Sequence, residues 1–128
     1  MLLAGCFTKK NPEIPKASVD HLQTIYQSYN KAAETLKRGP KDLDEFKKFL
    51  PPGTNADEIL ISPHDGKPYK LVWGVNPRTP PRGPFPPVMA YEQEGKDGEF
   101  DAITTMGVVR CKQDELKKFI AATPGAGQ

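Results

Sequence analysis

Residues 21–36 carry the stretch that decides the fold, HLQTIYQSYNKAAETL. Its apolar side chains recur at intervals of three and four residues, which is the spacing of one face of an α-helix. This face carries Leu22, Ile25, Tyr26, Tyr29, Ala33 and Leu36. We predict a helix over residues 19–37, with Ser18 as its N-cap and Gly39-Pro40 as its end. Such a stripe has to be covered by another part of the chain.

A second, short helix is predicted directly after this stop. Asp42 and Glu45 have the spacing of a capping box, which marks the start of a helix. Pro51-Pro52-Gly53 ends it. One more helical turn is expected at residues 57–60. The side chains that the second helix is predicted to bury are Leu43, Phe46, Phe49 and Leu50.

The remaining sequence changes its apolar period from about 3.6 to about 2 residues, which is typical of β-strands. A dense turn at residues 62–68 precedes this region, and a stiff, proline-rich crossing occupies residues 76–87. Asp97-Gly98 is a strong hairpin signal. Predicted strands lie at residues 69–75, 88–92, 100–105 and 107–111, and a short helix lies at 114–121. The order predicts an α+β fold, in which a small antiparallel sheet of three to four strands packs on the long helix.

Composition indicates one domain and excludes some classes of function. The chain has 128 residues and a net charge of +2, and its charges of both signs are interspersed, so we expect no nucleic-acid partner. No apolar run approaches the roughly 20 residues of a membrane-spanning helix. We place the globular domain at residues 18–122 and a flexible tail at 123–128.

The first residues of the chain contain Leu3-Ala4-Gly5-Cys6, which resembles the lipobox of bacterial lipoproteins. The resemblance implies that residues 1–5 are the remnant of a signal peptide and that Cys6 is the lipid attachment point. Residues 6–17 then form the lipidated cysteine and a polar tether. Because a secretory signal needs a longer apolar region, we expect the true start to lie upstream. Phe7, in place of the aspartate that retains many lipoproteins in the inner membrane, favours the outer membrane facing the periplasm.

Two alternatives to lipidation remain open at this point. The cysteine at position 6 can be accidental, in a protein of the cytoplasm. It can also form a disulfide with Cys111, the only other cysteine of the chain, which would exclude lipidation. If Cys6 carries lipid, we expect Cys111 to be a buried thiol.

The middle of the chain resembles the globular domain of type II secretion pseudopilins. The resemblance rests on residues 39–46 and on Ser62-Pro63-His64-Asp65-Gly66-Lys67-Pro68-Tyr69, which stands in for the family's Asp-Pro-Trp-Gly-x-Pro-Tyr loop. The later sequence also resembles the ending of pilin-like proteins. It has a strand at residues 88–92, the Asp97-Gly98 turn and a further strand that includes residues 106–109. A pseudopilin assembles through a long apolar N-terminal helix, which is missing here. The resemblance therefore implies a pilin-like head without the polymerising stalk.

Two groups of residues are candidates for chemistry. His64-Asp65 could be an acid–base pair, although a turn in which Asp65 caps backbone amides is the interpretation we favour. Five carboxylates surround the hairpin at residues 92–101, and pseudopilins often bind calcium in a nearby loop. The resemblance makes Glu94, Asp97 and Asp101 calcium candidates. The alternative is a solvated hairpin tip without a metal. The acidic group consists of Glu92, Glu94, Asp97, Glu99 and Asp101.

These observations predict a lipid-anchored protein of the cell envelope that is not an enzyme. We expect it to act in binding or assembly, as an accessory of a secretion or pilus system for example, with the membrane lipid and an envelope protein as partners and no cofactor. The rival hypothesis is a small periplasmic hydrolase or metal-dependent enzyme that uses His64, Asp65 and the acidic hairpin at residues 92–101. Geometry discriminates between the two, since the enzyme has no site if His64 lies far from the hairpin.

Overall fold

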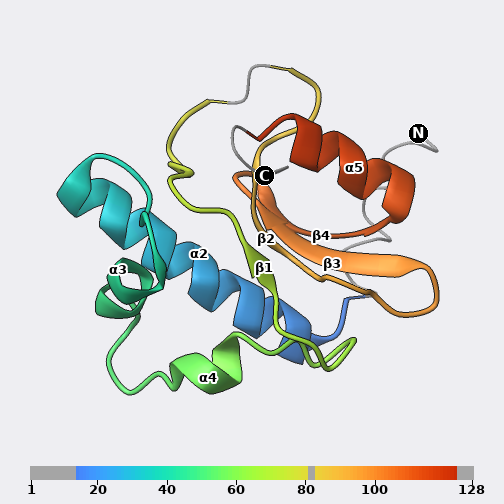
Figure 1. The fold of residues 1–128 in the computed structure, drawn as a ribbon, viewed down its shortest axis with the longest axis horizontal. Helices are drawn as coiled ribbons and strands as arrows, with labels where there is room; N and C mark the ends of the chain where they lie inside the picture. Colours follow the sequence, from blue (N-terminus) through green and yellow to red (C-terminus); the bar gives the residue numbers. More distant parts are fainter. Residues whose placement is uncertain (1–13, 81–82, 124–128) are drawn as a thin grey trace.

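The elements follow the predicted order in a computed structural model that describes residues 14–80 and 83–123. The fold is α+β, and the four strands form one antiparallel sheet in the order β1-β2-β3-β4 (Figure 1). The predicted lipobox, Cys6, most of the tether and residues 124–128 of the tail lie outside the described residues. The helices are α2 (Lys16–Leu36), α3 (Leu43–Lys48), α4 (Ala56–Ile59) and α5 (Gln113–Ala121), and the strands are β1 (Lys70–Leu71), β2 (Val88–Tyr91), β3 (Glu99–Thr104) and β4 (Gly107–Lys112).

Helix α2 begins three residues before the predicted start. Its N-cap is Pro15 rather than Ser18, whose side chain is buried within the helix, so the prediction of a Ser18 cap is wrong. The fixed φ of proline prepares the chain to enter a helix, and the Pro15 carbonyl already accepts a hydrogen bond from the Val19 amide at 3.1 Å. The helix ends as predicted before Gly39, with Lys37 in the left-handed conformation.

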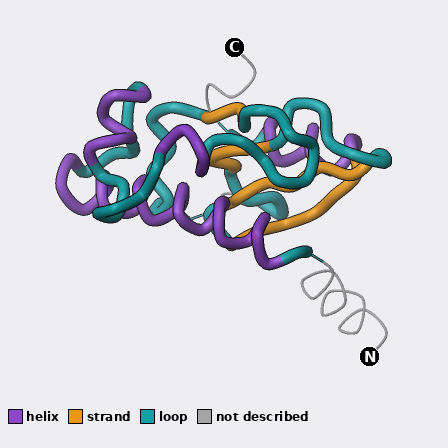
Figure 2. The backbone as a smooth tube through the Cα atoms, turned by 90° about the horizontal axis from the view of Figure 1, so that it is seen from below, coloured by secondary structure: helices purple, strands orange, loops and turns teal. Residues whose placement is uncertain are grey.

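The apolar stripe of α2 is the centre of the core. Leu22, Ile25 and Tyr29 are completely buried, and burying one such side chain stabilises a fold by about 1.5–3 kcal/mol. Figures 1 and 2 show the strands on one side of this helix, while α3 and α4 lie against it from another side. The Tyr29 hydroxyl donates to the Val72 carbonyl at 2.8 Å. The helix is therefore joined to the segment after β1 by both packing and a buried hydrogen bond.

Strand β1 is much shorter than the predicted strand at residues 69–75. Only Lys70 and Leu71 pair with β2 as strand residues. Gly74 then adopts a φ of 84°, and its amide donates to the Pro40 carbonyl at 2.7 Å. The chain leaves the sheet to meet the loop after α2, and this tertiary contact overrides the strand-like sequence.

The other strands agree with the predictions to within one residue. Asp97 and Gly98 both have positive φ, 54° and 80°, which is the pattern of a tight two-residue hairpin turn. Lys96 and Glu99 exchange two backbone hydrogen bonds across that turn, at 2.9 and 3.0 Å. A second tight turn at residues 105–106 joins β3 to β4.

Both faces of the sheet are covered. Successive residues of a strand point to opposite faces, and both Ile103 and Thr104 of β3 are buried. Ile103 lies beside side chains of α2, whereas Thr104 shares a hollow of about 350 Å³ with Phe85 and with Phe119 of α5. Helix α2 therefore covers one face of the sheet, and α5 with the end of the proline-rich segment covers the other.

Helix α3 has the predicted cap, but most of the burial predicted for it is wrong. Asp42 caps α3 and accepts a hydrogen bond from the Glu45 amide at 2.9 Å. Phe46 is buried as expected, but Leu43 is 39% exposed, and Phe49 and Leu50 are only half-buried. Helix α4 confirms the extra turn predicted at residues 57–60 and is capped by Asn55.

Both ends of the described chain pack against the domain. Ile14, which the sequence predicts to be tether, is buried, and so is Thr123, which it predicts to be tail. The Thr123 hydroxyl accepts a hydrogen bond from the Val88 amide at 2.8 Å and donates to the Phe119 carbonyl. This residue therefore ties the end of α5 to the start of β2.

Replacement of Gly39 by alanine should strongly destabilise the protein. An added Cβ would lie 1.9 Å from the Val75 carbonyl oxygen, which is backbone and has no flexible end to move. We expect Gly39→Ala to lower the free energy of unfolding by about 2–3 kcal/mol in urea denaturation. Gly83→Ala is the matched control, since an added Cβ meets nothing within 4 Å there, and it should change that free energy by less than about 0.5 kcal/mol. Equal stability of the two variants would contradict the close approach of residues 39 and 75.

Removal of the Tyr29 hydroxyl tests the buried hydrogen bond to Val72. Tyr29→Phe keeps the ring in the core but removes the donor, so we expect a loss of about 1.5 kcal/mol in the free energy of unfolding. Tyr26→Phe, at a half-buried position of the same helix, is the control and should cost less than about 0.5 kcal/mol. Urea denaturation followed by circular dichroism measures both.

Candidate functional site

The turn at residues 62–68 and the acidic hairpin, which the sequence separates by more than twenty residues, lie against each other. The Nδ1 atom of His64 is 2.8 Å from Oε1 of Glu92 and 3.8 Å from Oδ2 of Asp101. His64 comes from the turn, Glu92 follows β2 and Asp101 lies within β3. The geometric condition for a site that combines His64 with the hairpin is therefore met.

Glu92 is a fully buried carboxylate with a complete set of partners. Its Oε2 atom accepts from the Ser62 hydroxyl at 2.5 Å, and its Oε1 atom accepts from the Asp101 amide at 2.6 Å as well as lying beside His64. A buried carboxylate without such partners would be very costly. Glu92 thus joins the turn to both strands of the hairpin.

Asp101 forms the second buried charge, and Arg110 is its partner. The two residues face each other across β3 and β4, and the Arg110 guanidinium binds both carboxylate oxygens, with its Nε atom 2.5 Å from Oδ1 and Nη2 2.8 Å from Oδ2. This fork geometry is the strongest form of ion pair in proteins. Because of the hydrogen bonds to Asp101, the pKa of Arg110 is raised above its ordinary value.

Tyr69 brings an unsatisfied hydroxyl to the same place. Its side chain is buried, and its hydroxyl oxygen has no hydrogen-bond partner among the described residues. Burial raises the pKa of Tyr69; the neighbouring Ser62 hydroxyl acts in the opposite direction, and the charges of Glu92 and Asp101 raise it further. We use the term buried polar cluster for this group, which consists of Ser62, His64, Tyr69, Glu92, Asp101 and Arg110.

Asp65 has the capping role that the sequence favours. Its Oδ1 atom accepts from the Lys67 amide at 2.9 Å, within the turn. Its Oδ2 atom accepts from the amides of Gly95 and Glu94, at 3.0 and 3.3 Å. The carboxylate therefore fixes the turn to the hairpin, and it is not paired with His64 as a catalytic dyad requires.

The predicted calcium ligands do not come together in the part of the chain that the structure describes. Glu94 and Asp97 are exposed on the hairpin turn, whereas Asp101 is buried beneath Arg110. The group of side chains that could hold a metal ion is instead His64, Glu92 and Asp101. The interpretation of all five carboxylates as a solvated tip is also wrong, because Glu92 and Asp101 are in the interior.

Sequence reasoning placed Glu92 and Asp101 in one acidic hairpin and considered His64 beside it, but missed Ser62, Tyr69 and Arg110 as members of the same cluster. One local signal existed, since Glu92 lies two residues after the buried Ala90 at the end of a strand and so is expected on the same face. The pairing of Asp101 with Arg110 depends on the strand register. That register could have been derived by counting outward from the turn at residues 105–106.

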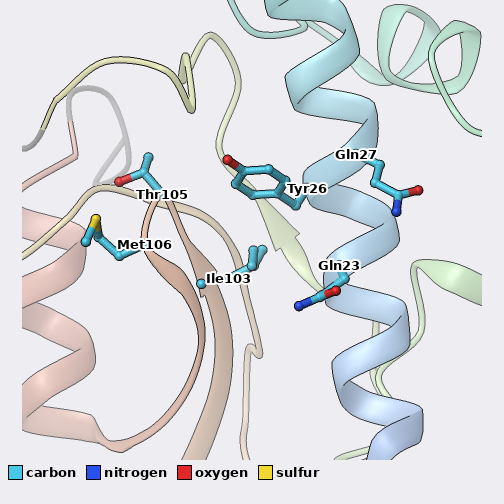
Figure 3. A pocket seen from close by; sticks show the side chains of 7 residues that line it. Gln23, Tyr26, Gln27, Ile103, Thr105 and Met106 are labelled. Atoms are coloured by element: carbon cyan, nitrogen blue, oxygen red, sulfur yellow. The ribbon is translucent and has the colours of Figure 1, made fainter. Parts of the chain in front are cut away.

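A separate hollow of about 400 Å³ lies between α2 and the turn at residues 105–106. Figure 3 shows Gln23 and Tyr26 of α2 directed toward Ile103 and Thr105 across it. Met106, at its rim, is 73% exposed, and the Thr105 hydroxyl is buried without a partner among the described residues. The hollow is therefore a small, mixed surface depression without charged groups among its lining side chains.

Comparisons with known proteins give no match to this chain, whether with protein-family models, curated proteins or solved structures. Cys6, the predicted lipidation residue, lies outside the described residues, while Cys111 is buried as expected.

Loss of the Arg110 cation should destabilise the protein far more than loss of a surface cation. Arg110→Met leaves the Asp101 carboxylate buried without its counter-charge, so the free energy of unfolding should fall by about 3 kcal/mol. Arg78→Met is the matched control, because its ion pair with Glu34 at 2.6 Å is half-exposed, and it should cost less than about 1 kcal/mol. Urea denaturation of both variants at neutral pH is the measurement. In the double variant Asp101→Asn/Arg110→Met part of the loss should be recovered, and additivity of the two changes would contradict the pairing.

Proposed function

We propose that this protein is a lipid-anchored, non-catalytic domain of the bacterial envelope that acts in binding or assembly. The observation that supports the proposal best is the order and packing of its elements. A long N-terminal helix, α2, lies on an antiparallel sheet whose strands are neighbours in sequence. This is the arrangement that the resemblance to the pseudopilin head implies. An accessory role in a secretion or pilus system fits such a head.

The contacts of the polar residues favour a structural role for them over catalysis. The Ser62 hydroxyl donates to Glu92, and both Asp65 oxygens accept from backbone amides. The side chains of Glu92 and Asp101 are 0% exposed, so a substrate in solvent cannot reach them directly. These groups therefore serve to hold a turn on a hairpin, which is a role in stability.

A second candidate function, a small metal-dependent hydrolase, is favoured by one observation. His64 lies 2.8 Å from Glu92, so the residues that this hypothesis requires are in contact. Its weakness is access, because both carboxylates are covered by Ser62, Arg110 and the turn that carries His64. The binding role is the proposal that we retain.

Attachment to the membrane rests on Cys6 in this proposal. Within the described residues, no helix has the length and apolar character needed to cross a bilayer. A diacylglyceryl group together with an N-acyl chain anchors a protein firmly, whereas a single chain holds it only marginally. The proposal therefore depends on modification of both the thiol and the amino group of Cys6.

Replacement of the Cys6 thiol tests the proposed anchoring. The gene with its upstream region should be expressed in a Gram-negative host and the extract separated into detergent and aqueous phases. We expect the unaltered protein in the detergent phase, Cys6→Ser in the aqueous phase, and Cys111→Ala, the control, in the detergent phase. Mass spectrometry should show Cys6 as an acylated N-terminus. An unmodified Cys6, or a Cys6–Cys111 disulfide, would overturn the proposal.

A further inference from the structure

The buried polar cluster lacks one positive charge. Glu92 and Asp101 together carry two negative charges in the interior, and their side chains are 0% exposed. Arg110 supplies one positive charge, and His64 is neutral unless it binds a proton. Burial of an uncompensated charge is strongly unfavourable. The cluster therefore calls for a further cation at the point where His64 meets the two carboxylates.

The ligand atoms lie near the spacing that a metal ion requires. One atom each from His64, Glu92 and Asp101 lies within 4.8 Å of the others, and His64 Nδ1 is 2.8 and 3.8 Å from the two carboxylates. Ligand atoms around a tetrahedral zinc ion are about 3.4 Å apart, because each bond is about 2.0–2.1 Å long. Shifts of about half an ångström would bring the histidine into that geometry.

The hydrogen bonds around these ligands are those that orient metal-binding side chains. Ser62 holds Oε2 of Glu92, the Asp101 amide holds Oε1, and Arg110 grips the Asp101 carboxylate. Partners of this kind, behind the direct ligands, fix the orientation of metal-binding groups and are part of a metal site. The hydrogen bonds from the strands and the turn therefore orient the two carboxylate ligands. The third ligand, His64, has a side chain that is 13% exposed, so a metal ion can enter the site beside it.

Tyr69 is an independent sign that something is bound here. Its hydroxyl is buried, makes no hydrogen bond of good geometry within the described residues although Ser62 lies nearby, and has its pKa raised by the charges of Glu92 and Asp101. Buried polar atoms are almost always satisfied in native proteins, and an exception calls for an explanation such as an ion or a water molecule. A metal ion between the carboxylates, or the water that completes its coordination, would give this hydroxyl a partner.

We propose that His64, Glu92 and Asp101 bind one divalent transition-metal ion, with zinc as the best fit. One imidazole nitrogen and two carboxylate oxygens form a ligand set that suits zinc. Calcium, in contrast, takes six to eight oxygen ligands and does not favour imidazole. The bound ion is structural, since it joins the turn that carries His64 to the strands β2 and β3. This site is distinct from the anchoring function and does not depend on it.

Titration calorimetry of the full chain with zinc chloride tests this site, after metal is removed by dialysis against a chelator that is then washed out. We expect one zinc ion per chain for the unaltered protein and at least tenfold weaker binding for His64→Gln and Glu92→Gln. His21→Gln and Glu94→Gln are the matched controls, because His21 is the only other histidine and Glu94 is an exposed carboxylate of the same hairpin. Both should bind zinc like the unaltered protein.

Thermal unfolding supplies a second readout, which also shows whether each variant folds. Zinc should raise the melting temperature of the unaltered protein and of both controls, and it should leave that of His64→Gln unchanged. Since Glu92 is fully buried, His64→Gln carries the test if Glu92→Gln fails to fold. Absence of stoichiometric zinc binding would overturn the proposal, as would tighter binding of calcium than zinc or unimpaired zinc binding by His64→Gln.

Discussion

The exclusion of water from the apolar stripe of α2 is the constraint around which the domain is arranged. Four short strands, one of them only two residues long, do not form a stable sheet alone. Helix α2 supplies their missing core through Leu22, Ile25 and Tyr29, and the Tyr29 hydroxyl holds the segment that leaves β1. The helix therefore determines both where the sheet lies and where its first strand ends.

Polar groups take the place of apolar packing where the loop before β1 meets the hairpin. The turn at residues 62–68 has few apolar side chains with which to hold the strands. Glu92 and Asp65 take over this role through hydrogen bonds to the turn and the hairpin. Polar contacts of this kind stabilise less per contact than burial does, but they specify one geometry. The geometry is what brings His64 to the carboxylates.

The sequence predicts those parts of the fold that depend on neighbouring residues. The Asp42 cap, the Asp97-Gly98 turn and the class of the fold are of this kind, and all three are confirmed. The predicted start of α2 and the predicted length of β1 were wrong. Pro15 favours an earlier start of the helix, and the Gly74 amide donates a hydrogen bond to the Pro40 carbonyl instead of continuing the strand. The contact of Ser62 and Tyr69 with the hairpin could not be predicted, because it depends on how the loop before β1 folds back. Cys6, on which the proposed anchoring depends, lies outside the described residues, so the fold does not bear on it.

The shortness of β1 has a consequence for the behaviour of the protein at high concentration. An outer strand with a long row of open amides and carbonyls is a template on which another chain can add, and this leads to fibrils. Here that edge ends after Lys70 and Leu71, and the opposite edge strand, β4, ends in the exposed cation Lys112. Molecules packed side by side would therefore meet either a very short edge strand or a positively charged one. Both disfavour amyloid-like growth.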